Sequence, residues 1–160
     1  MIVCSAQIRH IPGIINLLKQ VGEVHHHGRP DLFRAGAQKY NAVQLEAILS
    51  DPARPVFVAE EQGNVLGYGF CILQETRNNT VLCDSKVLYI DDLCVDKSCR
   101  GQHIGRKIYA HIETYAKEIG CDSITLNVWA FNESAMHFYK RLGMQERNIY
   151  MEMKLDAGKE

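Results

Sequence analysis

The sequence has 160 residues, of which 46% are hydrophobic, 23% charged and 8% aromatic. A chain of this length can bury a core that is stable without disulfides or a metal ion, so we expect a single domain over residues 1–160. Eighteen Lys and Arg against 19 Asp and Glu give a net charge of −1, which excludes a nucleic-acid-binding protein that relies on overall basic charge.

We expect neither a membrane segment nor a metal site. No apolar run approaches the roughly 18 residues needed to span a bilayer, and the N-terminal residues lack the basic and apolar regions of a secretion signal. The consecutive histidines His25, His26 and His27 cannot share one face of a helix or strand, and no C-x-x-C pair occurs. Several of the six cysteines lie in apolar runs, so we expect reduced thiols in a cytoplasmic protein.

The N-terminal third is predicted to hold one strand and two helices. Residues 2–8 are apolar and extended in character. The spacing of apolar residues predicts a helix over 11–24, ended by a segment that contains Gly28 and Pro30. A second helix is predicted to begin at Ala42 and to end near Asp51, because Pro52 disfavours helix in the residue before it.

The rest of the chain alternates between strands and helices. Residues 56–60 and 65–73 are predicted strands joined by the turn EQGN, and a third long strand covers 86–95. The later elements are a helix over 104–118 stopped by Gly120, a strand over 123–129, a helix over 133–142 ended by Gly143, and one or two strands within 144–155.

This order predicts an α/β fold with a mixed, mostly antiparallel central sheet flanked by helices. Hairpins make the centre antiparallel, and the strand–helix–strand unit over 86–129 is expected to be a parallel crossover. Where a parallel pair follows an antiparallel meander, neighbouring strands can splay and admit a ligand. We therefore place the chemistry near the ends of strands 86–95 and 123–129.

A glycine-containing loop before the helix at Ile104 is the strongest functional signal. The first N–H groups of a helix lack internal partners and lie at the positive end of its dipole, so such a site accepts a phosphate. Glycines let the backbone approach the ligand, and arginines add charge-assisted bonds. The alternative is a loop that only starts a helix, because short glycine motifs are weak signals. The candidate residues are Arg100, Gly101, Gln102, His103, Ile104, Gly105 and Arg106.

Two segments resemble the GNAT superfamily of acyl-CoA N-acyltransferases. LCVDKSCRGQHIGRKIY is similar to the family's loop Q/R-x-x-G-x-G/A, with Arg100 and Gly105 matching and His103 standing where the family usually has glycine. The order of elements fits that fold over essentially the whole chain. NVWAFNESAMHFYKRLGM is similar to the family's second signature, through Asn132, Ala135, Phe138, Tyr139, Leu142, Gly143 and Met144.

The resemblance implies direct transfer of an acetyl group from acetyl-CoA to an amine, without a covalent acyl-enzyme. It also implies a bulge in the strand before the loop, whose free backbone groups at Leu93, Cys94 and Val95 would hold the pantetheine arm. The segment from Arg100 to Arg106 would hold the pyrophosphate, and Asn132 and Tyr139 would also contact the cofactor. For Cys94, core packing is favoured over a covalent acyl-cysteine.

Catalytic roles follow from the same resemblance. The N–H of Leu93, freed by the bulge, would donate to the developing oxyanion. Tyr139 would protonate the leaving thiolate, because a phenol with a pKa of about 10 stays protonated at neutral pH. Asp91 or Asp92 is the candidate base, and only one of them is expected to face the slot because successive strand residues point to opposite faces. Similarity to diamine acetyltransferases favours Asp91; the alternative is a pair of solvated acids.

The segment HHHGRPDLF joins the first two helices, and in this superfamily that region often walls the acceptor site. The resemblance makes His26, Asp31 and Phe33 candidate substrate contacts together with Asp91; the alternative is a loop with a buried Phe33. A small-molecule amine or polyamine is favoured as acceptor over a protein N-terminus, and a peptide amine stays open as a substrate. We expect no nucleic acid or membrane partner. A homodimer would cover an edge strand near the C-terminus. The alternative function is a CoA-binding sensor or interaction module without turnover.

Overall fold

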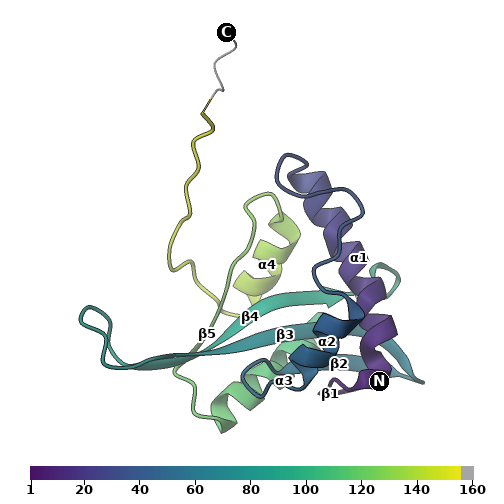
Figure 1. Cartoon of the computed structure of the whole chain (residues 1–160), viewed down its shortest axis with the longest axis horizontal. Helices are drawn as coiled ribbons and strands as arrows, with labels where there is room; N and C mark the ends of the chain where they lie inside the picture. Colours follow the sequence, from purple (N-terminus) through teal and green to yellow (C-terminus); the bar gives the residue numbers. More distant parts are fainter. Residues whose placement is uncertain (156–160) are drawn as a thin grey trace. The chain divides into compact units, whose positions relative to one another are not determined.

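The computed structural model describes residues 1–155 and divides the chain into two compact units, Met1–Asn127 and the part from Val128 onward. Figure 1 shows the elements of both units. The first unit contains, in chain order, β1 (Ile2–Ser5), a short 3-10 helix (Ile8–His10), α1 (Ile11–Gly28), α2 (Ala42–Leu49), β2 (Val56–Glu61), β3 (Asn64–Thr76), β4 (Ser85–Val95), a second 3-10 helix (Lys97–Cys99), α3 (Ile104–Glu118) and β5 (Ser123–Leu126). The second unit contains α4 (Glu133–Arg141).

A five-stranded sheet with the strand order β1-β2-β3-β4-β5 forms the centre of the first unit. The first four strands pair antiparallel, and β5 pairs parallel with β4 after the crossover through α3. This arrangement confirms the predicted mixed, mostly antiparallel sheet flanked by helices. No helix of the described chain has the length and apolarity needed to cross a bilayer.

The two faces of this sheet are covered by different helices. Tyr68 and Phe70 of β3 belong to a buried cluster with residues of α1 and α2. Phe57 of β2 points to the opposite face, where its ring contacts His111 and Tyr115 of α3 at centroid distances of 4.9 and 5.2 Å. Because successive side chains of a strand point to opposite faces, a single apolar strand can contribute to the packing on both faces of the sheet.

Helix α1 extends further than predicted. It continues through the three histidines to Gly28, and the Arg29 N–H donates to the carbonyl of His25 at 2.9 Å. Histidine does not break a helix, and Pro30 restricts only the residue before it, so the helix ends at that point rather than near residue 24. The first strand and β5 are shorter than predicted, ending at Ser5 and Leu126.

The predicted strands within 144–155 are wrong. These described residues have no regular secondary structure. Met144 is half-buried, whereas the apolar side chains further along are highly exposed: Ile149, Tyr150, Met151, Met153 and Leu155. Their alternation suits a strand, but a strand forms only against a partner strand. The described part of the second unit contains no strand that could supply one.

Candidate active site

The N-terminus of α3 presents unpaired amide groups. Lys107 is the first residue of α3 whose N–H donates a hydrogen bond to a main-chain carbonyl, that of His103 at 3.1 Å. The N–H groups of Ile104, Gly105 and Arg106 therefore have no acceptor within the helix. The first turn carries no acidic side chain, and His103 makes no side-chain cap. This end of the helix is suited to an anion.

The backbone of His103 explains the departure from the family's loop. Its φ is +60°, in the left-handed region, and Gly101 before it has a φ of +81°. Glycine adopts such angles freely, and histidine tolerates them better than most residues do. His103 therefore adopts a turn conformation that a glycine would adopt without strain.

The loop before α3 is fixed to α1 by Gln20, a residue that the sequence did not single out. The Gln20 side chain accepts the Lys97 N–H at 3.0 Å and donates to Asp96 at 3.1 Å. Asp96 also accepts hydrogen bonds from the N–H and hydroxyl of Ser98, at 2.8 and 2.6 Å. These bonds hold the start of the loop in place before any ligand binds.

The last part of β4 pairs with β3 on one side and with no strand of the described chain on the other. Its pairing with β5 ends at Ile90, whereas its pairing with β3 continues to Val95. The Asp96 N–H bonds to the carbonyl of Leu66, and because the bonding direction alternates in an antiparallel pair, the main chains of Leu93 and Val95 point away from β3. Leu93 and Val95 are two of the three predicted pantetheine contacts, and that role stays a prediction.

Cys94 fits that role less well. The same alternation turns its main chain toward β3, and its side chain is only 6% exposed. Burial, followed by the charge of Asp92, raises the pKa of the thiol to about 12. Cys94 is therefore a buried thiol rather than a nucleophile, as favoured from the sequence.

A bulge in β4 brings two carboxylates to the same side of the sheet. Phe70 pairs with Asp92 and the next residue of β3 pairs with Ile90, which leaves Asp91 without a partner. The rings of Tyr40 and Tyr68, which bind Asp91 and Asp92 respectively, both pack on Phe70. The expectation that only one aspartate could face the slot is wrong, because an extra residue interrupts the alternation. The predicted bulge was expected to free the backbone of Leu93, whereas the observed bulge lies at Asp91.

The Asp91 carboxylate is surrounded by donors from the segment before α2. Lys39 Nζ lies 2.8 Å from Oδ2, and the Tyr40 hydroxyl donates to the same oxygen at 2.9 Å. Arg54 in turn donates to the Tyr40 hydroxyl at 3.0 Å. The carboxylate is therefore ion-paired rather than solvated.

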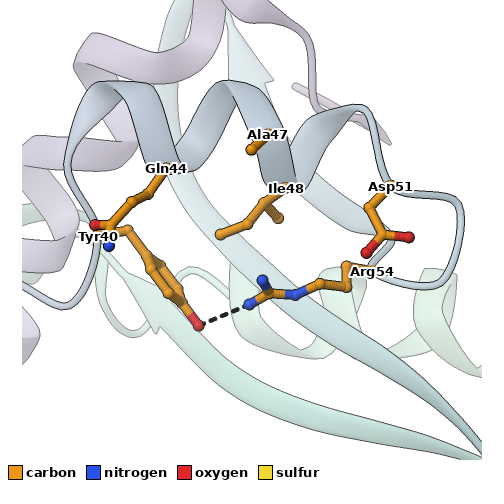
Figure 2. Close-up of a pocket in the computed structure, with 6 residues that line it drawn as sticks. All are labelled: Tyr40, Gln44, Ala47, Ile48, Asp51 and Arg54. Carbon is orange, nitrogen blue, oxygen red and sulfur yellow. Dashed lines mark hydrogen bonds between the residues drawn. The ribbon is translucent and has the colours of Figure 1, made fainter.

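Tyr40 and Arg54 also line a cavity of about 260 Å³ beside α2. Figure 2 shows the Arg54 guanidinium reaching across this cavity to the Tyr40 hydroxyl. The remaining lining residues are Gln44, Ala47, Ile48 and Asp51. The cavity adjoins the donors that hold Asp91.

Asp92 has the electrostatics of a proton acceptor. Burial raises the pKa of its carboxyl group to about 6, although the 2.8 Å hydrogen bond from the Tyr68 hydroxyl opposes the rise. The N–H of Leu93 also lowers this pKa, so the carboxylate lies close to the predicted oxyanion donor. No local pattern in the sequence distinguishes Asp92 from Asp91 in this way.

The candidate acceptor contacts lie at the end of α1 and just beyond it. His26 Nδ1 is 2.7 Å from the carbonyl of Phe33, whose ring packs against His25 at 4.9 Å. Asp31 makes a two-pronged bond with Arg29, at 2.8 and 2.7 Å. The structure thus brings His26 and Phe33 together, and their contact with substrate stays a prediction.

The second unit carries the other two cofactor candidates. The Asn132 side chain accepts the Ala135 N–H at 3.2 Å and caps α4. Tyr139 lies on the same helix, half-buried, with its ring 5.1 Å from that of Phe138. Their roles toward the cofactor stay predictions.

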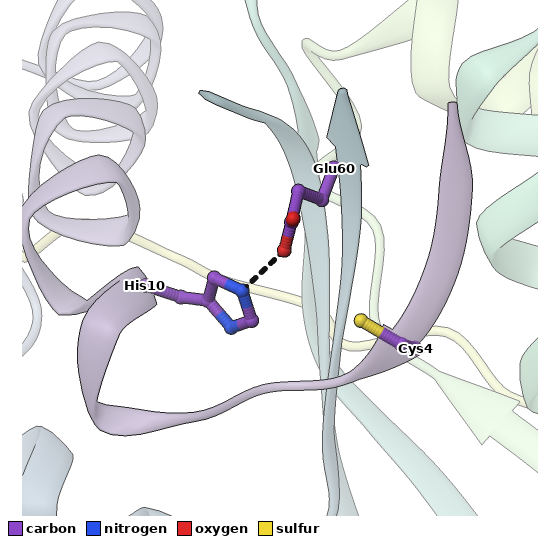
Figure 3. Close-up of side chains that lie close together, drawn as sticks. All are labelled: Cys4, His10 and Glu60. Atoms are coloured by element: carbon purple, nitrogen blue, oxygen red, sulfur yellow. Dashed lines mark hydrogen bonds and ion pairs between the residues drawn. The ribbon is translucent and has the colours of Figure 1, made fainter. Parts of the chain in front are cut away.

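Figure 3 shows a cluster with metal-binding side chains, Cys4, His10 and Glu60, whose ligand atoms lie within 4.8 Å of one another. His10 Nδ1 accepts the Gln7 N–H, so the ring proton lies on Nε2, which donates to Glu60 at 2.6 Å. Both ring nitrogens of His10 are therefore used in hydrogen bonds, and neither offers a free lone pair to a metal ion. Arg9 also binds the Glu60 carboxylate, at 2.9 Å. We interpret the cluster as a structural hydrogen-bond network around the Arg9–Glu60 ion pair.

Comparison with known proteins identifies the family. Residues 21–144 match the model of the acetyltransferase (GNAT) family. The chain belongs to this family.

Three similar proteins illustrate the relationship. A thialysine N-ε-acetyltransferase of Bos taurus is 34% identical over 100 residues, which cover 62% of this chain and 52% of that protein. The chain spans about half the length of this curated relative. The crystal structure of a mutant BH1408 protein from Bacillus halodurans is 33% identical, with a TM-score of 0.92, covering 97% of this chain and 99% of that one.

A third protein shares the fold at low sequence identity. The aminoglycoside N-acetyltransferase AAC(6')-Iy, in complex with CoA, is 17% identical with a TM-score of 0.69, covering 96% of this chain and all of that one (100%).

Proposed function

We propose that the protein is an acetyl-CoA-dependent N-acetyltransferase whose acceptor is a primary amine of a small molecule. The observation that carries the proposal is the uncapped N-terminus of α3 directly after the free edge of β4, with two carboxylates at the bulge of that strand. Membership of the GNAT family, whose members use acetyl-CoA, supports it independently.

The described residues fit the cosubstrate. The free N–H groups at the start of α3, together with Arg100 and Arg106, suit a diphosphate. The outward-facing main chains of Leu93 and Val95 suit the amide groups of pantetheine. Acetyl-CoA supplies the acetyl group and a thiolate leaving group.

Different residues of the protein are proposed to carry out the separate steps of acetyl transfer. The Leu93 N–H stabilises the oxyanion. Asp92, with a pKa of about 6, accepts the proton that the attacking amine loses, and Asp91 attracts the amine while it is still a cation. Tyr139 protonates the departing sulfur. Leu93 and Tyr139 keep the roles that the resemblance gave them. The role of base passes from Asp91, which the resemblance favoured, to Asp92, whose raised pKa supports it.

A small cationic acceptor suits this site better than a protein N-terminus. Two adjacent carboxylates attract a compact positive charge. The names of the related proteins include thialysine and aminoglycosides, both of them small amines. We also propose a cytoplasmic location, because all six cysteines are free thiols, and a homodimer that covers the open edge of β5.

The test is CoA thiol release from acetyl-CoA with a panel of amines: thialysine, lysine, spermidine, an aminoglycoside and a peptide with a free N-terminus. We expect turnover with at least one small amine and none with the peptide. Tight CoA binding without turnover on any amine would instead identify a CoA-binding module.

A further inference from the structure

We propose that Lys39 is an internal acceptor, acetylated on Nζ by the active site of its own chain. The proposal rests on the function proposed above and assigns a modification site in the segment before α2. Its basis is the position of the Lys39 ammonium, which occupies the place that a cationic acceptor needs.

The contacts of Lys39 are specific to the bulge. Its Nζ lies 2.8 Å from the Asp91 side chain and 3.3 Å from the Asp91 main-chain carbonyl. Asp91 is the unpaired residue of β4, two positions before Leu93, whose N–H is the proposed oxyanion donor. An amine on Asp91 therefore lies two strand residues from the N–H group that is proposed to bind the thioester oxygen.

Hydrogen bonds to neighbouring side chains fix the Asp91 carboxylate in this arrangement. The Tyr40 hydroxyl fixes the same carboxylate oxygen, and Arg54 fixes that hydroxyl, so Asp91 is held in one orientation. Asp91 is only 15% exposed, whereas Lys39 is 42% exposed and can move toward a bound ligand. Other ion-paired lysines differ, since Lys117 and Lys140 pair with glutamates on the surface.

The reaction is the proposed transfer with Lys39 as nucleophile. The ammonium first loses a proton to the Asp91–Asp92 pair, and the neutral nitrogen attacks the thioester carbon. A C–N bond forms, the C–S bond breaks, and the nitrogen loses its second proton as the CoA sulfur gains one. The products are N-acetyl-Lys39, CoA thiol and one released proton.

Acetylation would change the site that performed it. The acetylated side chain has no charge and cannot form the ion pair, so Asp91 becomes available to a cationic acceptor. We therefore expect the acetylated protein to have a lower KM for a cationic amine than the unmodified protein.

The experiment is incubation of the purified full-length chain with acetyl-CoA and no amine, with acetylation at each lysine followed by peptide mass spectrometry. We expect Lys39 to react roughly tenfold or more faster than Lys117, because it is held beside the site. The rate per molecule should not depend on protein concentration. Lys117→Arg is the matched control and should leave acetylation of Lys39 unchanged.

Two further variants separate enzymatic from chemical acetylation. Gly105→Glu, which should prevent CoA binding, and Asp91→Asn, which removes the ion pair, should both slow acetylation of Lys39. Equal reaction at Lys39 and Lys117, or an unchanged rate at Lys39 in Gly105→Glu, would overturn the inference. Normal turnover of an amine without acetylation of Lys39 refutes only this inference, whereas failure of both reactions also refutes the proposed function.

Discussion

The Tyr68 hydroxyl donates a 2.8 Å hydrogen bond to Oδ2 of Asp92, across the β3–β4 pair. Burial raises the pKa of Asp92 to about 6, and this bond limits the rise. A base with this pKa is largely ionised at neutral pH and still accepts a proton effectively. The bond thus connects the core of the sheet to the proposed proton transfer.

We expect kcat/KM for an amine substrate to rise with pH through an apparent pKa of about 6. Tyr68→Phe removes the hydrogen bond that favours the carboxylate, so the rising limb should move to higher pH. Asp92→Asn should lower kcat by roughly 10²–10⁴-fold and abolish the limb. Tyr115→Phe, a matched change on α3, should not shift the pH dependence of kcat/KM. If Asp92→Asn left that pH dependence unchanged, Asp92 would not be the base.

The same group makes stability depend on pH. Its folded pKa of about 6 lies above its ordinary value of 3.8, so the folded state binds the proton more tightly than the unfolded state does. The contribution of Asp92 to stability therefore falls as pH rises from about 4 to about 6 and stays unfavourable above that range.

Urea unfolding of the wild type and Asp92→Asn at several pH values isolates this effect. The variant should be more stable near pH 7, by up to about 3 kcal/mol, and the difference should shrink as pH falls toward 4. A difference that does not vary with pH would show that Asp92 has an ordinary pKa in the folded protein.

His103 has a left-handed backbone, with φ +60°, at the N-cap of α3. His103→Gly should raise the free energy of unfolding by about 1 kcal/mol, because glycine adopts this conformation without a Cβ penalty. Gly101→Ala, at φ +81°, should lower it by a similar amount. Chemical denaturation measures both changes, and a destabilised His103→Gly would mean that the imidazole makes a contact that matters more than the backbone.

Tyr139→Phe should lower kcat while acetyl-CoA affinity changes little, because the variant loses only the hydroxyl that would protonate the sulfur. Single-turnover kinetics and calorimetry separate the two quantities. An unchanged rate when chemistry is limiting would reduce Tyr139 to a helix residue that packs on Phe138.

Local signals in the sequence were sufficient for several elements. Helix α3 covers 104–118, as predicted, and Gly120, with φ +72°, follows it. Helix α2 begins at Ala42 after its cap Asn41, as predicted for its start, and ends at Leu49, shortly before the predicted end near Asp51. Apolar spacing and capping act within a few residues, so they can be read directly from the sequence.

The features that were missed depend on contacts between distant segments. The bulge at Asp91 follows from register with β3, and it places Asp91 and Asp92 on one side against the expected alternation. Lys39 meets Asp91 across 52 residues, which no spacing rule predicts. The alternating residues of 144–155 show the opposite error, because a strand pattern is not enough without a partner strand.

The central claim is that the N-terminus of α3 binds the diphosphate of CoA, and Gly105→Glu tests it most directly. A glutamate in the first helical turn is favourable to the helix itself, so the variant should fold, but it places bulk and negative charge against the ligand. Thr114→Glu adds the same charge on an exposed part of the same helix and serves as the control. We expect calorimetry to detect CoA binding to the wild type and Thr114→Glu and none to Gly105→Glu. Wild-type affinity in a folded Gly105→Glu would contradict the account.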